Sequence, residues 1–210
     1  RAFSFENALL DASLLLRDRM DNILTGGIDE MTDDSHAILS RFGLFRKEND
    51  DPDFQNKNSK GSISGEGASF FLLGREVVGA MAELKSFRTI YKPTGLAEVE
   101  IGIQQFLEEA SVSMKDIDLV IDGRNGDASH DETDRALSAG IFQNKPGFPF
   151  KTLCGEYPTA SGFALWLGAA LLSAQRIPDW FPPLHLPLKN ILIHNHFQHT
   201  HHSLFLISAC

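Results

Sequence analysis

Five histidines lie within nine residues near the end of the chain: His194, His196, His199, His201 and His202. In an extended segment His194 and His196 would share one face, and so would His199 and His201. Imidazole is a common zinc ligand, which makes these four side chains candidate metal ligands. Because no Cys or Asp ligand stands beside them in the chain, the pattern favours incidental metal binding over a dedicated zinc site.

Four further segments combine glycines and polar residues in a characteristic order. They read G-G-I-D-E-M-T at residues 26–32, G-E-G-A-S-F-F-L-L at 65–73, K-T-L-C-G-E-Y-P-T-A-S-G at 151–162, and H-N-H-F-Q-H-T-H-H-S-L-F-L-I at 194–207. In order and spacing they resemble the second half of a β-ketoacyl-acyl-carrier-protein synthase, a condensing enzyme of the thiolase fold. The resemblance covers nearly the whole chain and implies a layered αβαβα fold. The glycines of G-E-G-A-S do not follow G-x-G-x-x-G, so no nucleotide or other cofactor is expected.

Enzymes of this family carry a nucleophilic cysteine at the start of a helix, where backbone N–H groups and the helix dipole favour the thiolate. Counting back from the glycines at 26 and 27 puts that position at about Arg1. Neither Arg1 nor any of the next three residues is a cysteine. Ser4 is expected to cap the helix rather than to act as a nucleophile. The resemblance places Cys154 behind the active-site loop, as a buried small hydrophobic residue.

The first catalytic histidine of the family follows a strand, in a loop resembling N-A-H-G-T. The matching stretch here is I-D-G-R-N-G-D-A-S-H-D-E-T-D, which puts Gly123 at that histidine, or Arg124 if one residue is skipped. Neither residue can supply the neutral imidazole that polarises a thioester carbonyl. His130 lies six or seven positions further on and is expected to be a surface loop residue.

The second catalytic histidine belongs to a segment resembling K-S-M-T-G-H-x-x-G-A-A-G. Lys151, Gly155 and Gly162 match this segment, but Glu156 replaces the histidine. A carboxylate accepts hydrogen bonds where an imidazole would donate one, so Glu156 cannot stabilise an enolate in the same way. We expect Glu156 to pair with Lys151 or Arg124 and to fill the former catalytic cavity, with a general-base role as the alternative.

The last segment resembles N-S-F-G-F-G-G-x-N and keeps Asn195 and Phe197. In the family the glycines that follow let the backbone approach the acyl thioester. Here Gln198 and the residues after it replace them, which should reshape the mouth of the substrate tunnel. The resemblance thus gives Asn195, Phe197 and His199 as substrate-binding positions. In an alternative reading, His199 or His201 swings into the vacated histidine position.

Charge and composition narrow the choice of partner and compartment. The net charge of −9 over 210 residues leaves no basic footprint for nucleic acid. No apolar run approaches the roughly 18 to 20 residues of a membrane span. Only two cysteines occur, far apart in the chain, which fits a reducing cytoplasm rather than a disulfide framework. The chain opens without Met, and we expect it to be part of a longer polypeptide.

Hydrophobic periodicity supplies the elements that must position these residues, and a hydrophobic content of 42% supports a real core. Helices are expected from Ser4 or Asn7 onward and at residues 29–41, 98–110, 132–142 and 160–174. Strands are expected at residues 21–24, 68–73, 81–91, 117–121, 191–194 and 204–208, with a polar loop at 48–61. The glycine pair at 26 and 27 suggests a tight turn or a close approach of the backbone to a ligand. Alternating strands and helices indicate an α/β fold, with residues 1–79 ending a first thiolase-like half and 80–210 forming the second.

Three functions are consistent with these residues. The first is a catalytically degenerate subunit similar to the chain-length factors of polyketide systems, working with an acyl carrier protein in fatty-acid or polyketide-type chain elongation. Such a subunit would form a homodimer, or a heterodimer with a catalytic ketosynthase. The second is an active 3-oxoacyl synthase with an unusual residue set, performing a decarboxylative Claisen condensation. The third is a metal-binding or structural protein that uses the histidine cluster.

Overall fold

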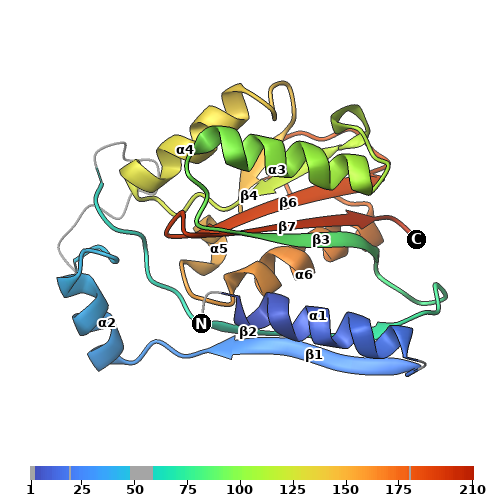
Figure 1. Ribbon diagram of the computed structural model, residues 1–210, viewed down its shortest axis with the longest axis horizontal. Helices are drawn as coiled ribbons and strands as arrows, with labels where there is room; N and C mark the ends of the chain where they lie inside the picture. The colour runs from blue at the N-terminus through green and yellow to red at the C-terminus, as the bar shows by residue number, and fades with distance from the viewer. Residues whose placement is uncertain (1–2, 19, 48–58, 180) are drawn as a thin grey trace.

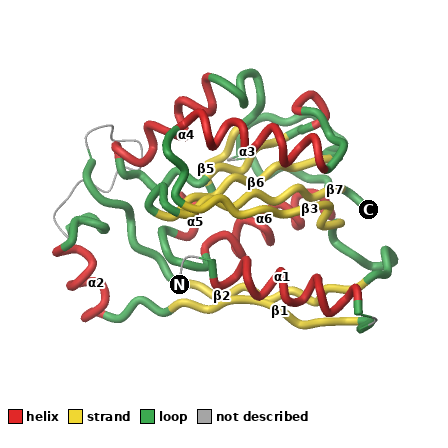
Figure 2. Tube along the Cα trace, in the orientation of Figure 1, coloured by secondary structure: helices red, strands yellow, loops and turns green. Residues whose placement is uncertain are grey.

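The computed structural model describes residues 3–18, 20–47, 59–179 and 181–210. Helices and sheets alternate in layers (Figure 1). Helices α3 (Leu96–Glu109) and α4 (Ala128–Ala139) cover one face of a five-stranded sheet, and α6 (Ala160–Ala174) covers the other (Figure 2). Beyond α6 and α1 (Ser4–Arg17) lies a two-stranded sheet. This is the layered α/β arrangement expected from the sequence.

The five-stranded sheet has the order β3-β7-β6-β4-β5. Its strands are β3 (Glu83–Tyr91), β4 (Leu119–Asp122), β5 (Gly147–Pro149), β6 (Asn190–Phe197) and β7 (His201–Ser208). Strand β4 is parallel to both β5 and β6, whereas β7 is antiparallel to both of its neighbours, β6 and β3. The parallel strands therefore end at one edge of the sheet, which gathers the loops that follow them.

Two hydrophobic clusters hold the layers together. One fills the space between the five-stranded sheet and the pair α1 and α6, and includes Phe5, Ile193 and Phe205. The other packs the opposite face of the sheet against α3 and α4, and includes Ile103 and Leu192. Strands β6 and β7 are buried on both faces over most of their length, which explains the apolar runs at residues 191–193 and 204–207.

Helix α6 lies where the sequence predicts it, at residues 160–174. It is apolar all round because it is buried between two sheets, against β6 and β7 on one side and β2 (Gly67–Gly74) on the other. Its first turn is tied to β1 (Asn22–Asp29), since the Asp29 carboxylate accepts hydrogen bonds from the Thr159 backbone N–H and hydroxyl at 2.8 and 2.7 Å. No helix of the described residues is long and apolar enough to cross a membrane.

The prediction for residues 21–41 is wrong in two places. The glycine pair does not turn the chain but lies within β1, which pairs antiparallel with β2 from Asn22 to Asp29. A Cβ atom on Gly26 would lie 2.3 Å from the carbonyl oxygen of Ser69, so the expected close approach is to the neighbouring strand. Helix α2 (Asp33–Arg41) consequently begins four residues later than predicted, after Thr32, whose hydroxyl accepts a hydrogen bond from Ser35 N–H.

The first residues of two other helices differ from their predicted positions, because capping interactions determine where a helix begins. Helix α4 begins at Ala128 instead of residue 132, because the Asp127 carboxylate accepts hydrogen bonds from the backbone N–H groups of Ser129 and His130. Helix α1 begins at Ser4 with Phe3 in the N-cap position, so neither Ser4 nor Asn7 caps it. Most of the predicted loop at 48–61 lies outside the described residues.

The remaining predictions agree to within a few residues with β2, β3, α3, β4, β6 and β7. The short helix η1 (Met114–Asp116) and α5 (Lys151–Cys154) were not expected from the sequence.

Candidate functional site

The candidate site lies where the parallel strands β4, β5 and β6 end. Strand β4 leads into the loop at residues 123–127, β5 leads into α5 and Glu156, and β6 leads into a hairpin turn. In open α/β sheets ligands bind at such carboxyl ends of strands. The sequence-predicted residues Arg124, Lys151 and Glu156 all come from these connections.

The carboxylate of Glu156 is the centre of a buried polar cluster. Its Oε2 atom accepts hydrogen bonds from Lys151 Nζ at 2.9 Å and from Asn125 Nδ2 at 2.8 Å. Lys151 Nζ also donates to the backbone carbonyl of His196 at 2.6 Å and lies 5.6 Å from the centroid of the Phe150 ring. Both charged side chains are buried, so the ammonium and the carboxylate compensate each other out of water.

Arg124 does not take part in this cluster, which corrects one of the two partners predicted for Glu156. Its guanidinium binds Asp122 in two places, Nε to Oδ1 at 2.7 Å and Nη2 to Oδ2 at 2.8 Å. Burial raises the pKa of Asp122, and the Arg124 contact counters that rise only in part. Arg124 is therefore committed to the end of β4 and is not free to reach a substrate carbonyl.

No side chain fits at position 123, the other candidate for the first histidine. A Cβ atom on Gly123 would lie 2.8 Å from the backbone nitrogen of His196 and 3.0 Å from the Cα of Asn195. The loop passes too close to β6 at this point. The first side chain that it can direct toward Glu156 is therefore that of Asn125, two residues further on.

Asn125 is a site residue that the sequence did not reveal. Its backbone N–H donates to Asp131 Oδ1 at 2.9 Å, and its own Oδ1 accepts from the N–H of Asp127 at 3.1 Å. These contacts leave Nδ2 to donate to Glu156. The family resemblance points to positions 123 and 124 as the catalytic ones. Because Gly123 packs closely against β6, the residue that contacts Glu156 is the one at position 125.

Gly155 gives the backbone the shape that presents Glu156. Its φ of +72° favours glycine, and a Cβ atom there would lie 2.7 Å from the backbone of Gly65. The chain then pairs with the segment before β2, since Glu156 N–H donates to the Ile63 carbonyl and Gly65 N–H donates to the Glu156 carbonyl. Gly65 and Gly155, which both belong to the family resemblance, thus bring their backbones into direct contact.

Cys154 is not an activated nucleophile. Burial raises the pKa of its thiol to about 12, and the nearby Lys151 cation offsets this rise only in part. The side chain packs against the core cluster but is only partly buried, whereas the prediction was a buried small hydrophobic residue. Arg1 and Ala2 lie outside the described residues.

Helix α1 adds one buried acidic group, Glu6. Its Oε1 atom accepts a hydrogen bond from the Ser203 hydroxyl at 2.6 Å, across the interface with β7. Burial raises the pKa of this carboxyl, and the hydrogen bonds from Ser203 and Ser161 counter the rise in part. The burial of Glu6 is not predictable from the sequence, because acidic residues in a first helical turn are usually exposed.

The three predicted substrate-binding residues do not lie together. Asn195 and Phe197 alternate with histidines along β6, so they share the face toward α1 and α6. His199 lies in the hairpin turn and faces α4 instead, where its Nε2 is 2.6 Å from the carbonyl oxygen of His130. The structure therefore separates His199 from Asn195 and Phe197.

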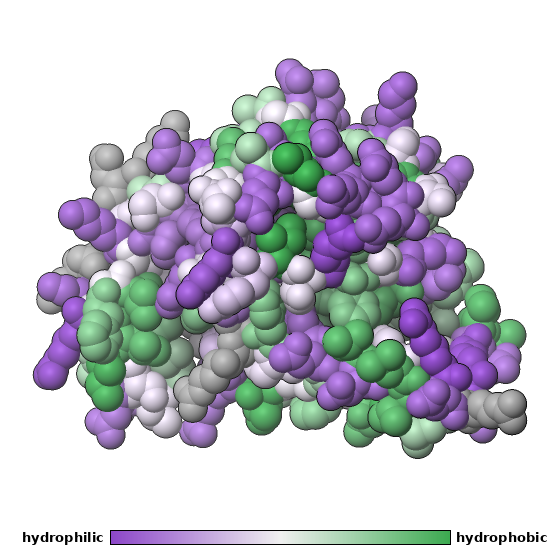
Figure 3. Space-filling model, viewed as in Figure 1, coloured by the Kyte–Doolittle hydropathy of each residue, from purple (hydrophilic) through white to green (hydrophobic). Residues whose placement is uncertain are grey.

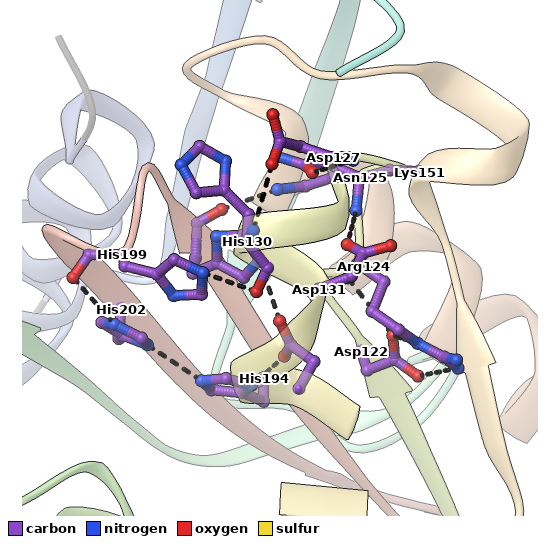
Figure 4. Close-up of polar contacts among 12 residues, drawn as sticks. Asp122, Arg124, Asn125, Asp127, His130, Asp131, Lys151, His194, His199 and His202 are labelled. Atoms are coloured by element: carbon purple, nitrogen blue, oxygen red, sulfur yellow. Dashed lines mark hydrogen bonds and ion pairs between the residues drawn. The ribbon is translucent and has the colours of Figure 1, made fainter. Parts of the chain in front are cut away.

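The opposite face of β6 carries the histidine cluster, which contains Asp134 of α4 at its centre. Figure 4 shows three of its histidines, His194, His199 and His202. His194 Nδ1 lies 3.2 Å from Asp134 Oδ1, and His196 Nε2 lies 2.9 Å from Asp134 Oδ2. His194 Nε2 is 3.1 Å from His202 Nδ1, and the His199 ring stacks on His196 at 4.3 Å between centroids.

The cluster differs from its prediction in several members. His201 points to the other side of the hairpin, where its ring contacts Phe3 and Tyr91 at centroid distances of 4.7 and 4.9 Å. His130 is not in a surface loop but in the first turn of α4, with its ring 5.0 Å from that of His199. Across the described ranges, no group of three or more His, Cys, Asp or Glu side chains is placed to hold a metal ion.

Asp134 was missed, although the sequence carries a signal for it. Asp127, Asp131 and Asp134 follow one another at helical spacing, and all three are buried. Three carboxylates on one helical face opposite a histidine-rich strand indicate buried pairing better than either segment alone.

Burial controls protonation in the cluster. Burial, together with the neighbouring His194 and His199, lowers the pKa of His202 to about 3. The pKa of His196 is also well below its usual value, because burial outweighs the attraction of Asp134. For Asp134 burial opposes ionisation, yet the contacts with His196 and His194 prevail and hold its pKa well below the usual range.

The hairpin turn after β6 has positive φ angles at residues that are not glycine. Gln198 and His199 have φ values of +54° and +49°, and Thr200 N–H donates to the Phe197 carbonyl. This is the geometry of a type I′ turn, which normally selects glycine or asparagine. Two consecutive non-glycine residues therefore hold a left-handed backbone at this turn.

Comparisons with known proteins bear on the fold. No protein-family model matches the chain, and no curated protein matches it in sequence. A β-ketoacyl synthase from Burkholderia phymatum STM815 superposes with a TM-score of 0.81 at 14% identity, covering 100% of this chain and 60% of that one.

The ketosynthase/chain length factor of ishigamide gives a TM-score of 0.74 at 18% identity, covering 96% of this chain and 56% of that one. A type II polyketide synthase acyl-carrier protein in complex with its ketosynthase gives 0.79 at 16% identity, covering 100% and 61%. This chain thus spans about three fifths of the length of these proteins. Residues 3–210, so far as they are described, have the thiolase-like fold of the ketosynthases and chain length factors.

Proposed function

We propose that this chain is a catalytically degenerate, chain-length-factor-type subunit of acyl-chain elongation. The observation that carries the proposal is the Lys151–Glu156–Asn125 cluster, in which a carboxylate that accepts hydrogen bonds from Lys151 and Asn125 lies where condensing chemistry needs an imidazole. The ionised carboxylate of Glu156 only accepts hydrogen bonds, so it cannot donate one to a developing enolate or oxyanion.

The surroundings of the cluster support the same reading. Position 123 has no room for a side chain, and the Arg124 guanidinium is bound to Asp122. Cys154 keeps its proton, because its pKa is raised to about 12. None of these groups supplies the nucleophile or the general acid and base that a decarboxylative condensation requires.

The proposed substrate is an acyl chain carried as a thioester on an acyl carrier protein, and the proposed partner is a catalytic ketosynthase or a second copy of the chain. Structures of a ketosynthase/chain length factor and of a ketosynthase with its acyl-carrier protein are among the similar folds, which supports this choice. Within that scheme residues 1–79 would end a first thiolase-like half and residues 80–210 would form the second. Asn195 and Phe197 would line the acyl chain.

The two cysteines, Cys154 and Cys210, are both free thiols. Free thiols persist in reducing compartments, which supports the cytoplasm as the expected location of this activity.

The experiment incubates the purified chain with acyl- and malonyl-loaded acyl carrier protein, alone and together with a catalytic ketosynthase. We expect no β-ketoacyl product from the chain alone, and an altered product length in the mixture. The Phe197→Ala variant should shift that length further, whereas Thr152→Ala, at an exposed position of α5, should not. Product from the chain alone that a thiol alkylator abolishes would establish the active-synthase alternative instead.

A further inference from the structure

The carboxyl group of Glu6 lies where three elements meet. Glu6 belongs to the first turn of α1, and only 1% of the residue is exposed. Its Oε1 atom accepts a hydrogen bond from the Ser203 hydroxyl of β7 at 2.6 Å. Ser161 of α6 also interacts with this carboxyl group, but in the described part of the chain neither its hydroxyl nor Glu6 Oε2 has an aligned hydrogen bond. Glu6 therefore connects α1 to the five-stranded sheet and to α6 through a carboxyl group with few donors.

Little positive charge is available to compensate an ionised carboxylate at this place. Among the described residues, no Lys, Arg or His side chain forms an ion pair with Glu6. Lys151 of α5 attracts the carboxylate from a distance, but its ammonium is already paired with Glu156 at 2.9 Å. A buried carboxylate without an ion pair is much less stable than the neutral acid. Burial accordingly raises the pKa of Glu6, and the two serines and Lys151 offset this rise only in part.

The other ionisable groups near the start of α1 have ordinary or satisfied states at neutral pH. His201 of β7 contacts Phe3 at the start of α1, and burial, with a smaller effect of Lys92, lowers the pKa of His201. His201 is therefore uncharged from neutral pH upward. On the side of the two-stranded sheet, Asp29 of β1 accepts hydrogen bonds from Thr159. A rise in pH thus acts on this contact through Glu6.

We propose that Glu6 makes the contact between α1 and the five-stranded sheet depend on pH. The neutral carboxyl group holds α1 against β7 and α6, and the ionised carboxylate weakens this contact and loosens α1. Asn195 and Phe197 lie on the face of β6 toward α1 and α6, so their surroundings change when α1 loosens. This inference does not rest on the proposed function.

The direction of the pH effect follows from the raised pKa of Glu6. An unfolded glutamate ionises at about pH 4.3. Above this pH the unfolded chain has lost a proton that the folded chain still holds on Glu6, so the contribution of Glu6 to stability falls as the pH rises. This fall ends once Glu6 ionises in the folded chain. His196 and His202, whose pKa values are lowered, act in the opposite direction below about pH 6.5. A variant that changes Glu6 alone therefore isolates its contribution.

The test is hydrogen exchange of the 210-residue chain, followed by mass spectrometry between pH 5 and pH 9 and corrected for the intrinsic exchange rate. In Glu6→Gln a neutral amide replaces the carboxyl group. We expect the protection of the α1 amides in the wild type, relative to Glu6→Gln, to fall by up to about tenfold per pH unit until Glu6 is ionised. Asp11→Asn removes an exposed acid of the same helix and should behave like the wild type. The proposal is wrong if the protection of α1 depends on pH equally in the wild type and in Glu6→Gln.

A second variant covers the case in which Glu6→Gln does not fold. Ser203→Ala removes the hydroxyl group that favours the ionised form of Glu6. The pH at which α1 loses protection should therefore rise in Ser203→Ala relative to the wild type. A purely structural role of the Glu6–Ser203 contact would leave that pH unchanged, and this result would overturn the proposal.

Discussion

The carboxylate of Glu156 meets two buried donors, the Lys151 ammonium and the Asn125 amide. Glutamine at this position keeps an acceptor oxygen but removes the charge that compensates Lys151. We expect Glu156→Gln to lower the free energy of unfolding by about 1 to 3 kcal/mol in a urea titration. Glu132→Gln, on an exposed position of α4, is the matched control and should change stability little. Equal stability of the two variants would contradict the compensating role.

The buried histidines predict how stability depends on pH. The pKa of His202 is lowered to about 3 in the folded chain, against about 6.5 for an unfolded histidine. Between these values the unfolded chain takes up a proton that the folded chain does not, so stability falls as the pH is lowered from 6.5 toward 3. His196, whose pKa is also lowered, acts in the same direction.

The His202→Gln variant isolates this contribution. Removing one such group should reduce the slope of unfolding free energy against pH by up to about 1.4 kcal/mol per unit in this window. Urea unfolding at pH 6.5, 5.5 and 4.5 measures it, with His201→Gln as the control. An unchanged slope in His202→Gln would show that His202 titrates normally in the folded chain.

At the residue scale the sequence predicted the Lys151–Glu156 pair but not its third member or the centre of the histidine cluster. The motif fixes Lys151 and Glu156 five positions apart on one short connection, so their contact is local. Asn125 reaches Glu156 because β4 and β5 are parallel neighbours in the sheet, and Asp134 reaches its histidines because β4 and β6 are. Such contacts depend on strand order, which the sequence alone does not specify.

The β6–β7 hairpin is the element in which backbone and sequence conflict most. Gln198 has a φ of +54°, a conformation that costs an ordinary residue energy and costs glycine none. We expect Gln198→Gly to raise the free energy of unfolding by about 0.5 to 1 kcal/mol. Thr200→Gly, outside the left-handed region in the same turn, should lower it. The measurement is thermal unfolding of both variants. Destabilisation by Gln198→Gly would show that the backbone of Gln198 is not strained.

Element types were predictable wherever burial imposes a clear period, and boundaries were not. Helix α6 was placed correctly because a long apolar segment with small residues suits a helix buried between layers. The end of β6 and the start of β7 were missed, because polar histidines resemble a turn. Cross-strand pairing of His196 with His202 and of Phe197 with His201 extends both strands through them.

On the scale of the whole molecule, the outer face of the two-stranded sheet stands out. Four apolar side chains on this face are mostly exposed: Leu24 at 69%, Ile28 at 70%, Phe70 at 60% and Leu72 at 72%. The register pairs Leu24 with Leu72 across the strands, so the four form one surface. Figure 3 shows apolar side chains among polar ones along the lower edge of the molecule, where β1 lies in Figure 1. Contiguous apolar surfaces of this kind mark interaction sites.

We therefore expect the isolated chain to self-associate through this face. Sedimentation should show a species heavier than the 23.2 kDa of one chain, and the Leu24→Thr, Leu72→Thr double variant should move it toward the monomer. Ile101→Thr, at an exposed apolar position of α3, is the control. A monodisperse monomer of the wild-type chain would show that the chain does not self-associate through this face.

The hydrogen bonds between Asp29 and Thr159 have a consequence for the order in which the chain folds. These residues are 130 positions apart, and they join the first turn of α6 to the end of β1. Contacts so distant in sequence form after local ones, because a long loop must close first. Helix α6 can pack on β6 and β7 before β1 arrives, but its first turn is fixed only when β1 does. The two sheets would then dock late in folding, and weakening this contact would speed unfolding more than it slowed folding.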